Sequence, residues 1–276
     1  MIKDICVYLD GGADDGPRIE TARQIAALFD AFIAGLYVTS LPEIQAVGGY
    51  AFGAIEIDEL QRDARERGDR DMKALKERFS GLDARHELRR HDVLQAHVRD
   101  VVLHEARLFD LFVTTRPYGH ENPAVEVTEA VLFGSGRATL LVPPGGIETF
   151  DPGTVVIAWS NTREAARAVS EAIPFLAHAK SVSVCMVGDD SMSSVERAAQ
   201  GTDIARHLDR HGVKVQLNPV PPGRGVAETL IEEAQVADAD LLVMGGYGHS
   251  RLREWVLGGV TREILTHAKI PVLIAH

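Results

Sequence analysis

The C-terminal stretch, residues 238–276, reads DADLLVMGGYGHSRLREWVLGGVTREILTHAKIPVLIAH. Its apolar run at 241–244 predicts a buried strand bounded by glycines. Gly245, Gly248 and Gly258 follow, then a helical pattern, and Pro271 opens a second apolar run. A strand that leads through a glycine-rich turn into a helix is a general way to hold an anion, because glycines let the backbone approach the ligand and the helix N-terminus offers unpaired N–H groups.

The composition is that of a globular protein long enough for two domains, with 276 residues, 45% hydrophobic and 25% charged. The net charge of −11 and the lack of a basic stretch argue against a nucleic-acid partner. No apolar run approaches the ~20 residues of a membrane span, and the N-terminus lacks the pattern of a signal peptide. We therefore expect a cytoplasmic protein in which Cys6 and Cys185 are buried, reduced thiols.

Strands and helices alternate twice along the chain. The first half has predicted strands at 5–9, 34–38, 86–90, 111–114 and 139–142, with helices at 19–32, 56–79, 93–107 and through Val131. The second has strands at 154–159, 182–187, 213–217, 241–244 and 271–275, with helices at 162–177, 194–211, 225–237 and after the glycine loop. This order predicts an α/β fold of two tandem Rossmann-like (flavodoxin-like) domains, 1–146 and 151–276, each with a five-stranded parallel sheet. Pro143–Gly146 breaks the pattern between them.

The two halves also match locally, which makes them an internal repeat. Residues 110–113 (DLFV) match 240–243 (DLLV), 118–120 (YGH) match 247–249 (YGH), and 127–128 (VT) match 260–261 (VT). From there Leu140 aligns with Leu273 without a gap. The first half has four residues fewer between its second and third matches, where the start of the helix is expected.

The spacing Gly245-x2-Gly248-x9-Gly258, the Val260-Thr261 pair and the closing PVLI strand resemble the nucleotide-binding loop of the universal stress protein family. The resemblance extends over both halves as two tandem copies. It implies a stress-response protein that binds ATP or AMP, with or without Mg²⁺, in its second domain. The residues that it implies around the base and sugar are Ala158, Trp159, Ser160 and Val187; those on the phosphate side are Met244, Gly245, Gly248, His249, Ser250, Gly258, Gly259, Val260 and Thr261.

Two positions depart from the family's nucleotide binders. Gly259 follows the third glycine where a Ser or Thr hydroxyl is usual, and Ser160 ends the first strand where Asp is usual. A lost hydrogen bond is worth about 0.5–1.5 kcal/mol, so the affinity should fall by roughly tenfold.

The first half shows the reverse pattern. It keeps Asp10, but its loop has Thr115 in place of Met244, Arg116 in place of the first glycine, and then Pro117, which lacks a backbone donor. We expect no ATP there, with Arg116 as an alternative contact for an anion. The nearby residues 134–136 (GSG) are predicted to end the preceding helix.

Binding without turnover is the leading interpretation, so no catalytic residue is assigned. The alternatives are a nucleotide-free structural or signalling module, and a weak ATP hydrolase in which His249 orients a water.

No metal site is predicted, because His97 and His104, seven residues apart, would lie about 10 Å apart on a helix. The expected partners are an adenine nucleotide and an unidentified protein. The family's last strands commonly pair between subunits; the resemblance therefore implies an internal pseudo-dimer, which a further homodimer would not contradict. Asp238 and Asp240 are expected to be solvated.

Overall fold

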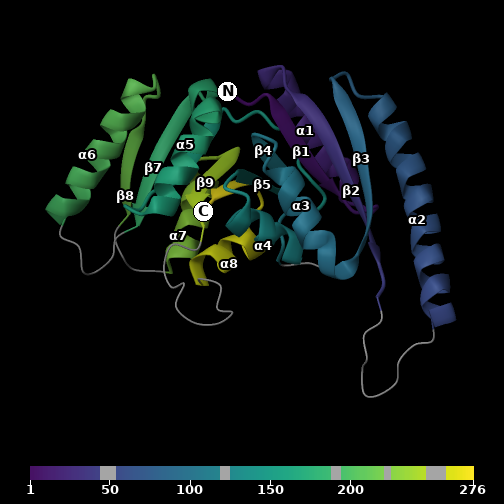
Figure 1. Cartoon of the computed structure of the whole chain (residues 1–276). Coiled ribbons are helices and arrows are strands. Elements are labelled where there is room, and N and C mark those ends of the chain that lie inside the picture. The colour runs from purple at the N-terminus through teal and green to yellow at the C-terminus, as the bar shows by residue number, and fades with distance from the viewer. Residues whose placement is uncertain (44–53, 119–124, 188–193, 221–224, 247–258) are drawn as a thin grey trace, which may run out of the picture.

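The chain folds into one twisted β-sheet with helices on both faces (Figure 1). The computed structural model describes residues 1–43, 54–118, 125–187, 194–220, 225–246 and 259–276. Its strands are β1 Asp4–Leu9, β2 Phe32–Leu41, β3 His86–Leu94, β4 Leu111–Thr115, β5 Ala138–Val142, β6 Thr154–Ala158, β7 Ser181–Val187, β8 Gln216–Val220, β9 Leu241–Gly245 and β10 Val272–Ala275. Its helices are α1 Asp15–Phe29, α2 Ala54–Ser80, η1 Gln95–His97, α3 Val98–Ala106, α4 Val125–Gly134, α5 Arg163–His178, α6 Ser194–Arg210, α7 Val226–Val236 and α8 Gly259–His267.

The strand order is β3-β2-β1-β4-β5-β10-β9-β6-β7-β8. Within each half the five strands are parallel, which confirms the predicted Rossmann-like α/β fold. β5 and β10 pair antiparallel, with Leu140 opposite Leu273. These two residues are also equivalent in the repeat, so a pseudo-twofold axis passes between them and the internal pairing of the last strands is confirmed. β5 ends at Val142 and β6 begins at Thr154; the assignment of 1–146 and 151–276 as separate domains stays a prediction.

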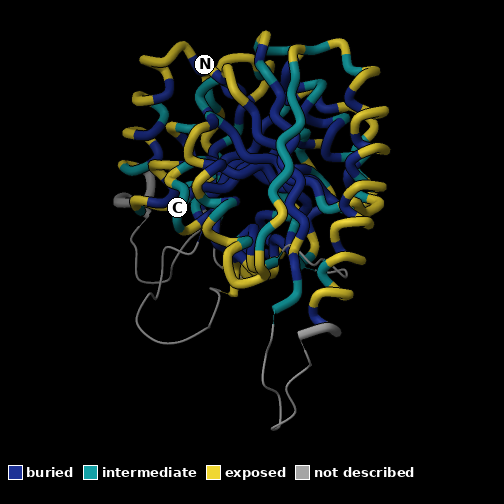
Figure 2. Tube along the Cα trace, turned by 45° about the vertical axis from the view of Figure 1, so that its right-hand side comes forward, coloured by how far each residue is buried: buried dark blue, intermediate teal, exposed yellow. Residues whose placement is uncertain are grey.

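The two halves share a hydrophobic core on one face of the sheet. Phe175 of α5 packs edge-on against Phe29 of α1 and Phe150 of the connection, with ring centroids 5.3 and 5.9 Å apart. The strands form the buried centre, and the exposed surfaces lie on the outer sides of the helices (Figure 2). Cys6 and Cys185 are buried and free, as predicted. Among the described residues, no helix combines the length and apolar character needed to cross a bilayer.

An aspartate at the start of the fourth strand joins that strand to the first one in both halves. The Asp110 carboxylate accepts the backbone N–H groups of Lys3 and Asp4 at 2.8 and 3.2 Å. Asp240 accepts the N–H of Thr154 at 2.8 Å. The prediction that Asp240 is merely solvated was therefore wrong, because its carboxylate satisfies the first backbone donor of β6.

The predicted boundaries of four elements were wrong by several residues. α1 begins at Asp15, four residues before the predicted start, because the side chain of Asp15 is buried in a polar network. β3 continues to Leu94, paired with Leu41, so the helix predicted from Val93 begins at Val98. β3 is an edge strand with mostly half-buried residues, and its charged sequence lacks the alternation that marks a strand. The strand predicted at 213–217 lies at 216–220, and the helix stop at Gly134 is confirmed.

Candidate functional site

The carboxyl ends of β6 and β9 meet at the point where the strand order of the second half reverses. In the sheet, β6 lies between β7, the next strand along the chain, and β9. The register places Ala158 opposite both Met244 of β9 and Cys185 of β7. Four of the predicted site residues, Ala158, Val187, Met244 and Gly245, therefore end neighbouring strands at one edge of the sheet. In open α/β sheets this switch point is where ligands bind.

The turn after β6 holds the next two predicted residues. The backbone N–H of Trp159 donates to the carbonyl of Cys185 at 2.9 Å, which extends the β6–β7 pairing by one residue. The Trp159 ring packs against the core, and its Nε1 is buried without a hydrogen-bond partner among the described residues. Ser160 is exposed, while Thr162 caps α5 by accepting the N–H of Ala165 at 3.2 Å. Ser160 thus offers an exposed hydroxyl beside the N-terminus of a helix.

Gly245 has a structural function that the sequence did not reveal. A Cβ at this position would lie 2.5 Å from the backbone nitrogen of Ala165 and 2.6 Å from the carbonyl carbon of Glu164. Only glycine lets β9 approach the first turn of α5 this closely. The next residue, Gly246, donates its N–H to Ala275 at 2.8 Å and accepts a hydrogen bond from His276 Nδ1 at 2.9 Å. Gly245 is therefore required for packing, whatever it contacts in a ligand.

α8 supplies the last predicted residues that the structure describes. Gly259 and Val260 open the helix and are exposed, and Thr261 is buried. A Cβ added at Gly259 would meet no atom of the described residues within 4 Å. Ile264 and Leu265 of α8 belong to the same apolar cluster as Met244, so α8 packs on the face of the sheet beside the end of β9. Gly248, His249, Ser250 and Gly258 lie outside the described residues.

In the first half, the equivalent strand end carries a buried ion network. Arg18 Nη2 donates to Asp15 Oδ1 at 2.6 Å and to Asp10 Oδ1 at 2.8 Å, and its Nε donates to the carbonyl of Asp14. The side chains of Arg18 and Asp15 are both 1% exposed. Burial raises the pKa of Asp15 to about 6, although the charge of Arg18 acts in the opposite direction. The aspartate that the first half keeps, Asp10, is therefore already bound to an internal cation.

One donor of Arg116 is already used within the protein. Its Nη1 donates to the carbonyl of Thr266 in the last turn of α8, and burial lowers the pKa of Arg116. Arg262 of α8 lies over the ring of Tyr118 at 5.5 Å. The segment after β4 thus supports α8 of the other half. A cation at the C-terminus of a helix is favourable because the last carbonyls carry partial negative charge.

The structure also shifts the alignment of the two loops by one residue. β4 ends at Thr115 and β9 ends at Gly245, and Arg116 and Gly246 make the same backbone bond to the last strand of their half. Thr115 therefore corresponds to Gly245, and not to Met244 as predicted. The predicted alignment was anchored on 118–120 (YGH), which lies beyond a one-residue difference in loop length.

The first half contains a cleft of about 720 Å³ that the sequence did not predict. It lies at the carboxyl ends of β1 and β2, between α2 and the N-terminal ends of α3 and α4. Among the residues that line it are Tyr8, Asp10, Tyr37, Asp71, Arg99 and Glu126. Asp10 was the one signal in the sequence, but the residues of α2 and α3 could be placed there only by the tertiary structure.

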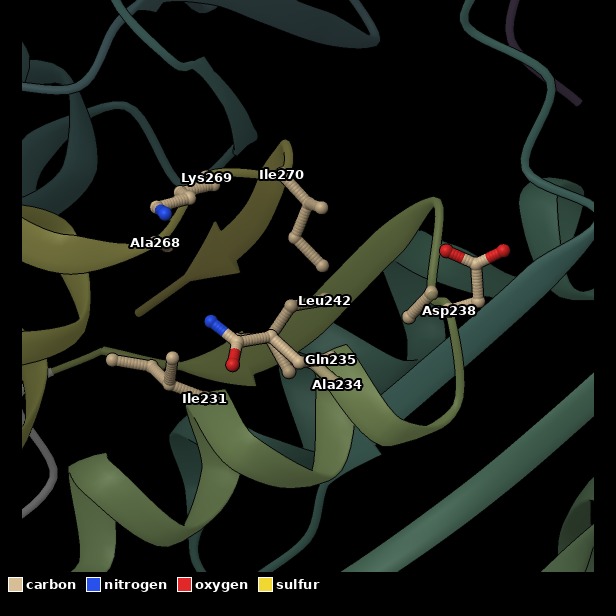
Figure 3. Close-up of a pocket in the computed structure, with 9 residues that line it drawn as sticks. Ile231, Ala234, Gln235, Asp238, Leu242, Ala268, Lys269 and Ile270 are labelled. Carbon is tan, nitrogen blue, oxygen red and sulfur yellow. The ribbon is translucent and has the colours of Figure 1, made fainter.

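A smaller groove of about 180 Å³ lies at the opposite edge of the sheet in the second half. Figure 3 shows Ile231 and Gln235 of α7 on one side of it and Lys269 and Ile270 on the other. Ala239 lines this groove, whereas the equivalent residue of the first half, Phe109, is a buried core residue. The aligned position of the first half thus carries a larger side chain. The described residues contain no group of three side chains suited to a metal ion.

Comparisons with known proteins place this geometry in context. A model of the universal stress protein family matches residues 153–276. Universal stress protein Slr1230 of Synechocystis is 40% identical over 67 residues, which span 24% of this chain and only 22% of that protein.

Two solved structures superpose over nearly the whole chain. A universal stress protein from Archaeoglobus fulgidus has a TM-score of 0.75 at 12% identity, covering 99% of this chain and 97% of that one. A functionally unknown protein from Pseudomonas aeruginosa, PA1789, has a TM-score of 0.62 at 16% identity, covering 99% and 92%. At these identities the matches establish a shared fold.

Proposed function

We propose that this chain, whose residues 153–276 match a model of the universal stress protein family, is a stress-response protein whose second half binds ATP or AMP, with binding rather than turnover as its output. The observation that carries this proposal is the meeting of β6 and β9 at the switch point, where Ala158 lies opposite Met244. Ser160, with an exposed hydroxyl, follows β6, and the exposed Gly259 and Val260 begin α8. Helix N-termini are favourable positions for phosphate groups.

The chemistry of the described residues suits a ligand of moderate affinity. Ser160 can exchange a hydrogen bond with a ribose hydroxyl, but it does so as a neutral group. Gly259 offers its backbone and no hydroxyl. Hydrogen bonds to charged groups are worth about 1.5–3 kcal/mol, so the absent hydroxyl costs roughly tenfold or more in affinity.

The first half is not expected to contribute a second nucleotide site. Asp10 is bound to Arg18, and Arg116 donates to Thr266. Pro117 follows, and it has no N–H to offer to a phosphate. We therefore propose one nucleotide per chain.

Isothermal titration calorimetry with ATP, ADP and AMP tests the proposal. The wild-type chain should bind about one equivalent. Gly259→Ser should increase the affinity by about tenfold, because it restores a hydroxyl at a position where a Cβ meets no atom of the described residues within 4 Å. Gly225→Ser is the matched control: Gly225 lies at the start of another helix, α7, and a Cβ there also meets no atom of the described residues within 4 Å. The control should leave the nucleotide affinity unchanged.

Three results would count against this function. The absence of heat at millimolar nucleotide would favour the nucleotide-free signalling module. A stoichiometry near two would refute the single site. An equal effect of Gly259→Ser and Gly225→Ser would show that the start of α8 is not where phosphate binds.

A further inference from the structure

The cleft of the first half has the dimensions and lining of a small-molecule site. Its volume of about 720 Å³ falls within the usual range for ligand pockets, roughly 300–1,000 Å³. Tyr8 and Tyr37 contribute aromatic side chains to its lining, and both are largely buried. Thr39 also lines the cleft, and its buried hydroxyl lies beside Tyr37 and Asp92.

The lining carries a net negative charge, although Asp10 is paired with Arg18. Four carboxylates, Asp10, Glu43, Asp71 and Glu126, contribute to it, against two guanidinium groups, Arg67 and Arg99, which are both exposed.

Two of the carboxylates lie close together at the base of the turn after β1. A Cβ added at Gly11 would lie 2.6 Å from Asp71 Oδ2, so Asp71 packs against the residue that follows Asp10. Tyr37 donates its hydroxyl to Asp71 Oδ2 at 2.8 Å. Burial and the charge of Asp71 both raise the pKa of Tyr37, so the phenol remains a hydrogen-bond donor to this carboxylate. Asp71 is therefore held in place while it borders the cleft.

The helix ends that could attract a phosphate already carry acidic groups. Glu43 accepts the backbone N–H of Ala96 at 2.9 Å, just before the start of α3. Glu126 lies in the first turn of α4. An anion that entered the cleft would meet these two carboxylates at the places where the helix dipoles would otherwise favour it. A cation would instead meet carboxylates and aromatic rings, the groups that bind ammonium ions in proteins.

We propose that this cleft binds a small organic cation carrying primary ammonium groups, held by Asp71 and bordered by Asp10, Tyr8 and Tyr37. The site is distinct from the nucleotide site proposed for the second half and does not depend on it. Spermidine and n-butylammonium are suitable probes, because one tests a polycation and the other a single ammonium group.

Calorimetric titration of the full chain should detect binding of spermidine, and Asp71→Asn should weaken it at least fivefold. Asparagine keeps an oxygen that can accept the Tyr37 hydroxyl, so the fold should be preserved. Asp83→Asn is the control, because it removes the same charge at an exposed position just beyond the C-terminal end of α2. Its effect should stay below twofold. Tyr37→Phe should strengthen binding about twofold, because it frees an oxygen of Asp71 while keeping the ring.

The tyrosine variant separates binding from damage to the fold, because a misfolded protein would not bind more tightly. No binding of either probe at 10 mM would overturn the proposal. Equal losses in Asp71→Asn and Asp83→Asn would also overturn it, because they would show general attraction to a chain of net charge −11. Displacement of spermidine by AMP would contradict the separation of the two sites. None of these outcomes depends on whether the second half binds nucleotide.

Discussion

Replacing Arg18 with methionine would leave the buried carboxylate of Asp15 without its closest cation. Arg18 Nη2 lies 2.6 Å from Asp15 and 2.8 Å from Asp10, and it is 1% exposed. Removing one partner of a buried ion pair typically costs about 3–5 kcal/mol, because the other charge stays buried and uncompensated. Methionine keeps most of the side-chain length, so the loss should report the charge rather than a cavity. In a protein of this size such a loss lowers the Tm by roughly 10 °C.

The cost should depend on pH. Burial raises the pKa of Asp15 to about 6 in the folded protein, above its value of about 3.9 in an unfolded chain. Between these values the folded state binds more protons at this carboxyl than the unfolded state, so its contribution to stability falls as the pH rises from 4 to 6. Without Arg18 the folded pKa rises further. The stability difference between wild type and Arg18→Met should therefore be larger at pH 8 than at pH 5.

Urea unfolding followed by circular dichroism at both pH values measures this difference. Arg23→Met is the control on the same helix: Arg23 pairs with Glu20, but it is 37% exposed. An exposed pair is worth about 0–1 kcal/mol, so this variant should lose little. Equal losses in the two variants, or a loss at Arg18 that does not change with pH, would refute the assignment of a buried charge network.

Three further substitutions test the packing. Gly245→Ala should lower the free energy of unfolding by about 1–3 kcal/mol, because the added Cβ would lie 2.5 Å from the backbone nitrogen of Ala165. Unchanged thermal unfolding would mean that α5 can move aside. Arg116→Met should lower the free energy of unfolding by about 1–2 kcal/mol and speed amide hydrogen exchange in α8, because the carbonyl of Thr266 loses its donor. Exchange in α8 at the wild-type rate would contradict this contact. Ala239→Phe should stabilise the chain by about 0.5–2 kcal/mol by filling the 180 Å³ groove, and a lower Tm would show that the groove cannot accept the ring.

The fold could be predicted because the buried strands carry their own signal. Runs such as 139–142 and 241–244 are continuous apolar segments between turn residues, and both proved to be central strands. The pairing of the last strands was predicted from the family resemblance, and Leu140 and Leu273, which the repeat aligns, lie opposite each other across the two halves. β3 was harder, because an edge strand need not be apolar and its charged sequence resembles a helix surface.

The candidate site was only partly predictable. Strand ends such as Ala158 and Met244 follow from the topology, and the register brings them together. The packing function of Gly245 could not be inferred, because it depends on how closely α5 approaches β9. The buried position of Arg18 was equally hidden, since an arginine within a helical pattern is usually solvated. The cleft of the first half depends on residues of α2 and α3 that are distant in sequence.

The antiparallel pairing of β5 with β10 has a consequence for how the two halves can change over time. When identical subunits pair, every substitution appears on both sides of the interface at once. Here the partners are joined covalently, so their contact does not weaken on dilution and a substitution alters one side alone. One copy can therefore accept Pro117 or Arg116 in its loop while the other keeps its glycines. Tandem fusion in this way allows two copies of a fold to take up different ligands within one molecule.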